Sequence, residues 1–372
     1  MIYDAAILGG GLAGLSLSID LRKRGYSVVV IEKGNYPRQK VCGEYISMES
    51  HRYLHSLCPA LASLNLPYIS HFRLSSTGRK EFQTKLDLGG FGISRFLLEE
   101  LLFTEAKSIG VDFKLKCKVI ETVHNPSEDD YTIKTNTGDV NARLVCNATG
   151  RKSNLETKER ETQLNGTNYI GIKYHVRLQR DPGFVEIHNF PGGYCGLSGI
   201  EDNKTCLCYI VNSKKLTSVH NSIPELEKKY LFQNSHLKTM FTNAEFLYKE
   251  PLTISGINFR IKKPATNSSF FLGDSAGSIA PVTGNGMSIA LRSASVLASA
   301  IDNYFTKTIN RQQLVENYTG FWNKEFTTRL KLSRHLQKLS EYPLLANLSI
   351  RLFNAFPGLG KRVIRHTHGA SF

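Results

Sequence analysis

Residues 2–32 read IYDAAILGGGLAGLSLSIDLRKRGYSVVVIE, and this stretch decides the fold. A short apolar run covers residues 3–8, residues 12–25 carry apolar side chains at helical spacing, and residues 27–31 are apolar and mostly β-branched. The order strand, helix, strand is typical of the βαβ unit of a parallel sheet. The sequence therefore predicts an α/β fold that begins with this unit.

The turn between the first strand and the helix carries the pattern G-x-G-x-x-G, formed by Gly9, Gly11 and Gly14 with Ala13 between the last two. Glycines here allow a sharp turn, close approach of a pyrophosphate to the backbone, and tight packing of the helix on the strand. The helix N-terminus adds free N–H groups and partial positive charge. Glu32 follows the second strand, where a carboxylate can accept hydrogen bonds from ribose hydroxyls. The motif therefore predicts a bound dinucleotide.

A second glycine-rich segment reads GDSAGSIAPVTGNGM over residues 273–287, after a short apolar run and before a predicted helix. Its carboxylate, Asp274, can hold the ribityl hydroxyls of a flavin. The glycine turn at Gly284 and Gly286 can offer backbone N–H groups to the pyrimidine edge, which becomes anionic on reduction. The first motif fits FAD and NAD equally because both contain adenosine diphosphate. The second motif favours FAD.

With both motifs present, the chain resembles the glutathione-reductase-type flavoproteins, and within them the branch of geranylgeranyl reductases and aromatic-ring hydroxylases. That branch carries G-D-x-A, then a proline, then G-x-G at the start of a helix. The matching residues are Gly273, Asp274, Ala276, Pro281, Gly284 and Gly286. The resemblance implies FAD as cofactor and a Rossmann-like FAD-binding domain.

Residues 36–44, YPRQKVCGE, are similar to the P-x-x-x-x-C-G-G segment of geranylgeranyl reductases, although Glu44 replaces the last glycine. Arg95, at the start of a predicted helix, is similar to the flavin-contacting arginine of the branch. The cofactor contacts assigned by motif and resemblance are Gly9, Gly11, Ala13, Gly14, Glu32, Lys33, Arg38, Cys42, Gly43, Arg95, Val119, Gly150, Gly273, Asp274, Pro281, Gly284, Gly286 and Met287.

We expect three parts in the fold. A discontinuous FAD-binding domain takes residues 1–60, 94–158 and 250–310, a substrate domain with an inserted antiparallel β-sheet takes residues 61–93 and 159–249, and a helical C-terminal segment takes residues 311–372. Turn residues between four strand-like stretches at 169–211 predict an antiparallel meander in the substrate domain.

Two redox reactions stay open. The first is reduction of carbon–carbon double bonds in an apolar, isoprenoid or polyene-like substrate by hydride from reduced flavin, with Cys42 and Tyr194 as catalytic residues. The second is oxygen-dependent hydroxylation of an aromatic or polyketide-type substrate. Hydroxylases of the branch carry an Asp-Gly motif, and this chain has Thr149 before Gly150, so we favour reduction. No second nicotinamide motif is evident, and the electron donor is either NAD(P)H or a reduced carrier.

The charge pattern suggests a hypothesis of another class. The chain has 47 Lys and Arg against 32 Asp and Glu, a net charge of +15, and the last fifty residues are strongly basic. Residues 344–356 have amphipathic spacing with basic flanks, which is typical of a helix that lies on a membrane surface. The protein could thus be a membrane-surface binding flavoprotein without turnover. The basic residues form no nucleic-acid-binding motif, so we expect no such partner.

Other sequence features predict the cellular compartment of the protein and whether it binds a metal. No stretch is long and apolar enough to span a bilayer, and seven irregularly spaced cysteines favour a reducing compartment. We expect a cytoplasmic protein or one at the inner face of the membrane, with an apolar small-molecule substrate. His175 and His188 fall on neighbouring predicted strands without a carboxylate or cysteine at ligand spacing, so we predict no metal site.

Overall fold

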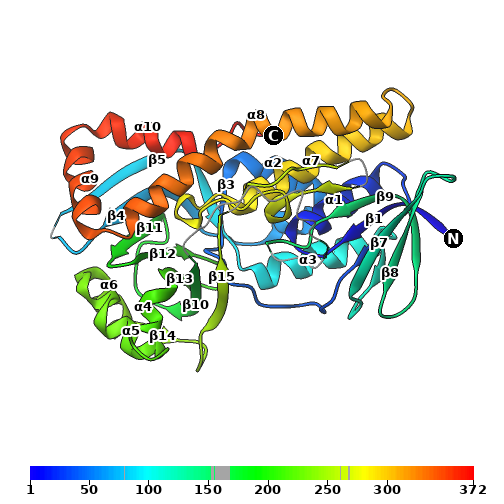
Figure 1. Cartoon of the computed structure of the whole chain (residues 1–372). Coiled ribbons are helices and arrows are strands. Elements are labelled where there is room, and N and C mark those ends of the chain that lie inside the picture. Colours follow the sequence, from blue (N-terminus) through cyan, green and yellow to red (C-terminus); the bar gives the residue numbers. More distant parts are fainter. Residues whose placement is uncertain (79, 152–154, 156–167, 260, 267–268) are drawn as a thin grey trace.

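The structure is a computed structural model that describes residues 1–78, 80–151, 155, 168–259, 261–266 and 269–372. Its strands form two sheets, and a long C-terminal helix runs along both of them (Figure 1). The first sheet contains the N-terminal βαβ unit, and the second sheet lies at the opposite end of the molecule. The region between the sheets is where a ligand can contact both.

The first sheet has the strand order β6-β2-β1-β9-β8-β7, with β16 beside β9. Strands β1, β2, β6, β9 and β16 are parallel, whereas β7 and β8 form an antiparallel ribbon that continues from β9. The bounds are β1 Ile2–Leu8, β2 Val28–Ile31, β6 Asp112–Lys114, β7 Val119–Asn125, β8 Asp130–Thr135, β9 Val140–Asn147 and β16 Phe270–Phe271.

Both faces of this sheet are covered, which explains why its central strands are continuously apolar. All four residues of β2 and the last four of β1 are buried. On one face they form a core with three helices, α1 (Leu12–Lys23), α3 (Arg95–Ser108) and α7 (Gly286–Phe305). On the other face the β7–β8 ribbon contributes Tyr131 and Ile133 to a second core.

The second sheet has the order β14-β10-β13-β12-β11-β4-β5-β3, with β15 beside β10. Its bounds are β3 Tyr45–Ser47, β4 Tyr68–Ser75, β5 Glu81–Gly92, β10 Tyr169–Arg177, β11 Phe184–Phe190, β12 Gly193–Gly199, β13 Thr205–Asn212, β14 Glu245–Phe246 and β15 Leu252–Ile257. Residues of the short helices α4 (Ser213–Thr217), α5 (Ile223–Lys229) and α6 (Ser235–Asn243) share a core with β10, β12 and β13. The remaining short helix, α2 (His51–Leu57), belongs to the core of the first sheet.

The strand order corrects the predicted meander. Strand β10 pairs with β13 rather than with β11, and β11 lies parallel to β4, so the second sheet is mixed. Hairpins join β11, β12 and β13, as the turn residues predict. The pairing of β10 joins segments that are distant in the sequence, and local turn residues do not encode it. Strands β3 and β15 also belong to this sheet, although we placed their residues with the FAD-binding parts.

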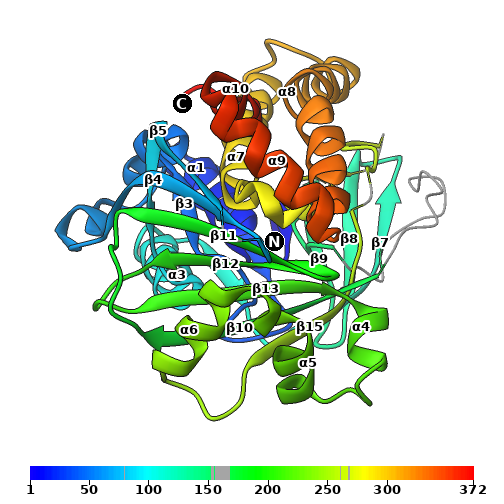
Figure 2. The ribbon, with the colours of Figure 1, turned by 90° about the vertical axis from the view of Figure 1, so that its left-hand side faces the viewer.

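The C-terminal segment is helical, as predicted. It contains α8 (Arg311–Ser340), α9 (Pro343–Ala355) and α10 (Pro357–Thr367), which lie together beside β4, β5 and β11 (Figure 2). Along α8 a row of buried side chains recurs every four residues, at Leu314, Tyr318, Trp322, Phe326 and Leu330. This row packs against α7 and fixes the tail to the first sheet.

The predicted α/β fold with a Rossmann-like sheet, a second sheet and C-terminal helices is confirmed. The predicted boundary at residues 158 and 159 lies outside the described residues. Within the described part of the chain, no helix has both the length and the hydropathy that crossing a membrane requires.

Candidate functional site

The two glycine motifs meet at one edge of the first sheet. Strand β16 pairs with β9, and β9 pairs with β1, all in parallel, so the turns that follow β1 and β16 lie at the carboxyl ends of neighbouring strands. Gly9 and Gly273 have φ angles of +102° and +57° directly after their strands. A Cβ atom added to Gly273 would lie 3.3 Å from the Cβ atom of Ala13. Two segments from opposite ends of the sequence therefore border one another.

The helices that follow these turns have uncapped N-termini. Among the described residues, no side chain accepts a hydrogen bond from the first turn of α1 or of α7. In contrast, Ser94 caps α3 and Asn310 caps α8. The amides of α1, and those of Gly286 and Met287 on α7, are therefore available to the oxygen atoms of a ligand.

Glu32 is buried at the end of β2, beside the first glycine turn. Its carboxylate accepts hydrogen bonds from the amides of Gly10 at 2.7 Å and Gly34 at 2.8 Å, and it pairs with Arg38 at 2.5 Å. Burial alone would raise the pKa of Glu32, but the hydrogen bond and charge of Arg38 lower it. An ionised carboxylate thus lies where the sequence places an acceptor for ribose hydroxyls.

Three cations gather around the buried carboxylate of Glu99, next to the start of α1. Arg38 Nε lies 3.2 Å and Lys40 Nζ 3.1 Å from Glu99, and Arg95 also pairs with it. Burial alone would raise the pKa of Glu99, but the three positive charges lower it to about 2. Lys40 Nζ is also 3.1 Å from the position of a Cβ atom on Gly11. Excess positive charge therefore lies where a diphosphate would approach the helix.

Sequence reasoning named Arg38 and Arg95 for this cluster and missed Lys40 and Glu99. Glu99 lies four residues after Arg95 on α3, so helical spacing could have indicated the pair. No sequence pattern assigns Lys40 to the cluster, apart from its position in a basic loop. Lys33, also predicted as a cofactor contact, is exposed.

The other predicted contacts lie at the same edge of the sheet or begin the elements next to it. Gly150 comes just after β9, and Pro281 begins the short turn before α7. Val119 is the first residue of β7. The amide of Cys117 donates a hydrogen bond to the carbonyl oxygen of Glu32, so the start of β7 lies beside the end of β2. Asp274 is partly exposed and lies 3.9 Å from Arg151.

These groups fit FAD. The uncapped helices would supply amide donors at both ends of the cofactor. In this arrangement Glu32 and Asp274 would supply acceptors for ribose and ribityl hydroxyls, and the cluster of Arg38, Lys40 and Arg95 would supply charge for the diphosphate.

The pKa of Lys40 predicts how FAD binding depends on pH. Desolvation and the charge of Arg95 lower this pKa to about 8, although Glu99 opposes the shift. Lys40 therefore loses its charge as the pH rises through about 8. We expect the affinity of the apoprotein for FAD to fall above this pH, and Lys40→Arg to retain it to about pH 9.5. Fluorescence titrations with FAD measure this. Identical pH profiles for both proteins would contradict the assignment of Lys40 to the diphosphate.

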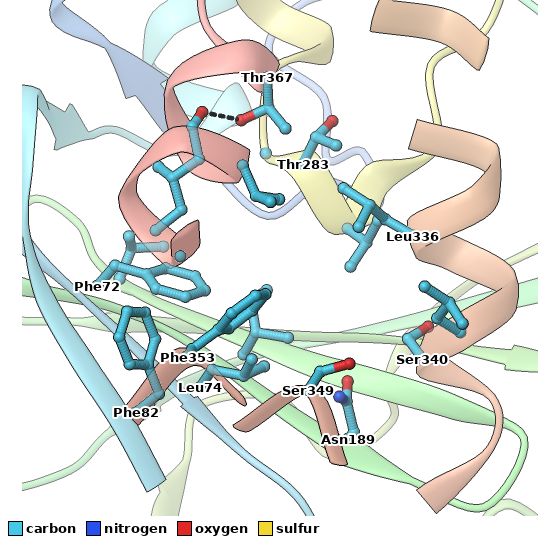
Figure 3. A pocket seen from close by; sticks show the side chains of 18 of the residues that line it. Phe72, Leu74, Phe82, Asn189, Thr283, Leu336, Ser340, Ser349, Phe353 and Thr367 are labelled. Atoms are coloured by element: carbon cyan, nitrogen blue, oxygen red, sulfur yellow. Dashed lines mark hydrogen bonds between the residues drawn. The ribbon is translucent and has the colours of Figure 1, made fainter. Parts of the chain in front are cut away.

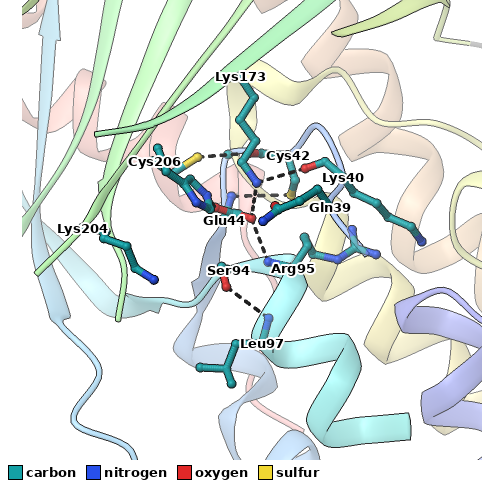
Figure 4. A network of polar contacts seen from close by, with 12 residues as sticks. Gln39, Lys40, Cys42, Glu44, Ser94, Arg95, Leu97, Lys173, Lys204 and Cys206 are labelled. Atoms are coloured by element: carbon teal, nitrogen blue, oxygen red, sulfur yellow. Dashed lines mark hydrogen bonds and ion pairs between the residues drawn. The ribbon is translucent and has the colours of Figure 1, made fainter. Parts of the chain in front are cut away.

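A second buried network joins the loop before β3 to the second sheet (Figure 4). Glu44 is fully buried and lies 2.5 Å from both Lys173 Nζ and His175 Nε2 on β10. It also accepts a hydrogen bond from the amide of Arg95 at 2.7 Å. Burial alone would raise the pKa of Glu44, but the hydrogen bond from His175 and the charge of Lys173 lower it. The network holds the segment that carries Cys42 between the two sheets.

Cys42 itself makes contacts on both sides of this segment. Its Sγ accepts a hydrogen bond from the amide of Glu44 at 3.5 Å, and its carbonyl oxygen accepts one from the thiol of Cys206 at 3.2 Å. Glu44, His175 and Cys206 place possible metal-ligand atoms within 4.8 Å of one another, a grouping that sequence spacing missed. Because the ammonium of Lys173 pairs with Glu44, we interpret the grouping as an ion-pair network.

Tyr194 lies in the interior of the second sheet. Its ring packs in a core with Tyr169, Ile187 and Ile210, and burial raises the pKa of its hydroxyl well above 10. Tyr194 is not among the described residues that line the apolar cavity of the protein. On β12 the ring lies on the same sheet face as Asn189, its cross-strand neighbour, and Asn189 lines the cavity, so the contact of Tyr194 with a substrate stays a prediction.

The apolar cavity lies between the C-terminal helices and the second sheet (Figure 3). Its volume is about 150 Å³, and its walls come from β4, β5, β11, α8, α9 and α10. Val282, Thr283 and Gly284 of the second glycine motif complete the wall. The few polar lining residues are Asn189, Thr283, Ser340, Ser349, Thr367 and His368. An apolar chamber thus reaches the turn that we assign to the flavin.

Comparison with known proteins supplies the family. The sequence profile described as FAD binding domain matches residues 3–319. The chain belongs to the FAD binding domain family. Its cofactor is FAD, and it is an FAD-dependent oxidoreductase.

Curated relatives and solved structures align with most of the chain. Conditioned medium factor receptor 1 of Dictyostelium discoideum is 24% identical over 94% of this chain and 73% of its own length. Ubiquinone hydroxylase UbiM of Neisseria meningitidis is 23% identical over 98% of this chain and 84% of its own. The solved structure of the flavin-dependent brominase Bmp2 has a TM-score of 0.80 at 19% identity, over 100% of this chain and 94% of its own. These relatives do not single out geranylgeranyl reductases.

Proposed function

We propose that this protein is an FAD-dependent monooxygenase that hydroxylates an apolar substrate of aromatic or polyketide type. The observation that carries the proposal is the apolar cavity, because Val282, Thr283 and Gly284 belong both to its wall and to the flavin motif. A substrate in this cavity would lie against the flavin end of FAD. The likeness to a ubiquinone hydroxylase and to a flavin-dependent brominase supports oxygen chemistry over reduction of double bonds.

The reaction balances with an external reductant. One oxygen atom of O₂ enters a C–H bond of the substrate, the other leaves as water, and NAD(P)H or a reduced carrier supplies the two electrons. FAD, when bound, supplies the two-electron reduction of O₂. The amides at the start of α7 would hold the pyrimidine edge, and the apolar walls of the cavity would exclude water from the reacting atoms.

Asn189 gives the cavity a polar feature (Figure 3). Its Oδ1 atom is buried and has no hydrogen-bond partner among the described residues. An unpaired buried oxygen costs about 1–3 kcal/mol unless a donor meets it. We therefore expect a substrate with an apolar body and one hydroxyl or N–H donor, as in a phenol.

Oxygen dependence tests the proposed reaction. The purified protein is photoreduced without air and mixed with long-chain phenols and quinols, then with ¹⁸O₂ or with buffer free of oxygen. We expect mass spectrometry to find one ¹⁸O atom in the product, and product only in the samples with oxygen. A product that gains two hydrogen atoms without oxygen would overturn the proposal. As a control, Val363→Trp should fill the cavity and stop turnover while FAD is retained.

Double-bond reduction is the second candidate function. The observation in its favour is the position of Cys42, which the Glu44 network holds between the two sheets. The anaerobic arm of the same experiment measures it directly.

A further inference from the structure

Helix α9 exposes a row of large apolar side chains. Eight of the fourteen exposed large apolar residues in the described part of the chain lie between Leu339 and Leu359. Leu344, Leu348 and Phe356 expose 83%, 62% and 63% of their surface, and they fall at helical spacing together with Leu352. Such clustering is unlike the scattered apolar residues of an ordinary soluble surface.

The opposite face of α9 lines the apolar cavity. Ala346, Ser349 and Phe353 belong to the cavity wall. Leu339, at the end of α8, both lines the cavity and exposes 40% of its surface. The exposed apolar row is therefore continuous with the wall of the cavity, and α9 separates the cavity from solvent.

Basic residues flank the exposed row. Residues 323–372 contain nine Lys and Arg but only two acidic residues. Arg351, Lys361 and Arg362 are exposed and have no acidic partner among the residues that the structure describes, whereas Arg365 pairs with Asp87. The surface thus combines an apolar ridge with unpaired positive charge, which complements an anionic bilayer.

We propose that α9 and the first turns of α10 dock on an anionic lipid bilayer, with the leucine row in the boundary between headgroups and acyl chains. The basic flanks then contact lipid phosphates, and the cavity behind α9 takes up its apolar substrate from the bilayer. The uptake step rests on the proposed function, whereas the docking step does not. A lipid surface accounts for both the exposed apolar row and the unpaired cations of α9 and α10.

Vesicle sedimentation tests the docking step without turnover. The FAD-loaded protein is spun with vesicles of phosphatidylcholine alone or with one-third phosphatidylserine. We expect stronger binding to the anionic vesicles, weakened by salt. Leu344→Ser/Leu348→Ser should reduce binding on the order of tenfold or more. Arg351→Gln/Lys361→Gln/Arg362→Gln should abolish the preference for anionic lipid.

Matched controls place the changes on other faces. Ile120→Ser removes an exposed apolar side chain on β7, and Lys214→Gln/Lys228→Gln/Lys238→Gln removes three exposed charges near α4–α6. Both should bind vesicles as the unaltered protein does. Failure of the unaltered protein to bind anionic vesicles, or equal binding by the double serine variant, would overturn the proposal. A dimer of the unaltered protein that Leu344→Ser/Leu348→Ser dissociates would also overturn the proposal, because a second copy of the chain would then cover the leucine row. The oxygen experiment is independent of each result.

Discussion

Gly14→Ala is expected to abolish FAD retention. A Cβ atom at this position would overlap the backbone carbonyl oxygen of Gly9, so α1 must move away from the turn. Overpacking of this kind costs about 1–3 kcal/mol of stability. The moved helix also loses its place behind the diphosphate, and a binding loss of about 2.7 kcal/mol weakens affinity about a hundredfold. The flavin absorbance per chain after purification, and the affinity of the apoprotein for FAD, measure this.

Gly320→Ala provides the matched control. Gly320 lies within α8, and a Cβ atom there would contact nothing within 4 Å. This variant should keep its FAD and gain about 0.5–1 kcal/mol of stability from better helix propensity. If Gly14→Ala purified with as much FAD as Gly320→Ala, the first glycine turn would not hold the cofactor.

Glu44→Gln is expected to destabilise the fold by about 3–5 kcal/mol, because it leaves the buried ammonium of Lys173 without a counter-charge. The double variant Glu44→Gln/Lys173→Met removes both charges and should recover much of the loss. Urea unfolding followed by circular dichroism gives the three free energies. A Glu44→Gln variant as stable as the unaltered protein would show that this ion pair does not stabilise the fold.

The same variant has a predicted pH dependence. The pKa of Glu44 is lowered in the folded protein, so its contribution to stability is present above the unfolded value of about 4.3. That contribution is lost as the pH falls through the folded pKa. The difference in unfolding free energy between the unaltered protein and Glu44→Gln should therefore shrink below about pH 4.

The sequence predicted the parts of the site that have local patterns. Gly9 and Gly14, and the Gly273–Asp274 pair, follow strands and precede helices or short turns, so spacing alone placed them at the carboxyl edge of a parallel sheet. Glu32 could be assigned because it ends the next strand. For the same reason the α/β class and the helical tail were predicted correctly.

The rest depends on contacts between distant segments. The pairing of β10 with β13 and the meeting of Glu44 with Lys173 and His175 are not encoded in any local spacing. The cavity is closed by three helices that follow the last motif, so its existence could not be inferred from the FAD-binding residues. The role of Tyr194 stays a prediction, because strand alternation places its ring on the cavity face of the sheet but does not encode a contact with the substrate.

The visible spectrum of the purified protein, titrated with an apolar phenol, tests the central claim most directly. That claim is that one FAD spans the two glycine turns with its flavin end at the apolar cavity. We predict one extractable FAD per chain and a shift of the flavin absorption bands as the phenol fills the cavity. We also predict that Val363→Trp, which occupies the cavity, binds FAD without this response. A colourless protein that cannot be reconstituted, or flavin bands that no cavity ligand changes, would contradict the account.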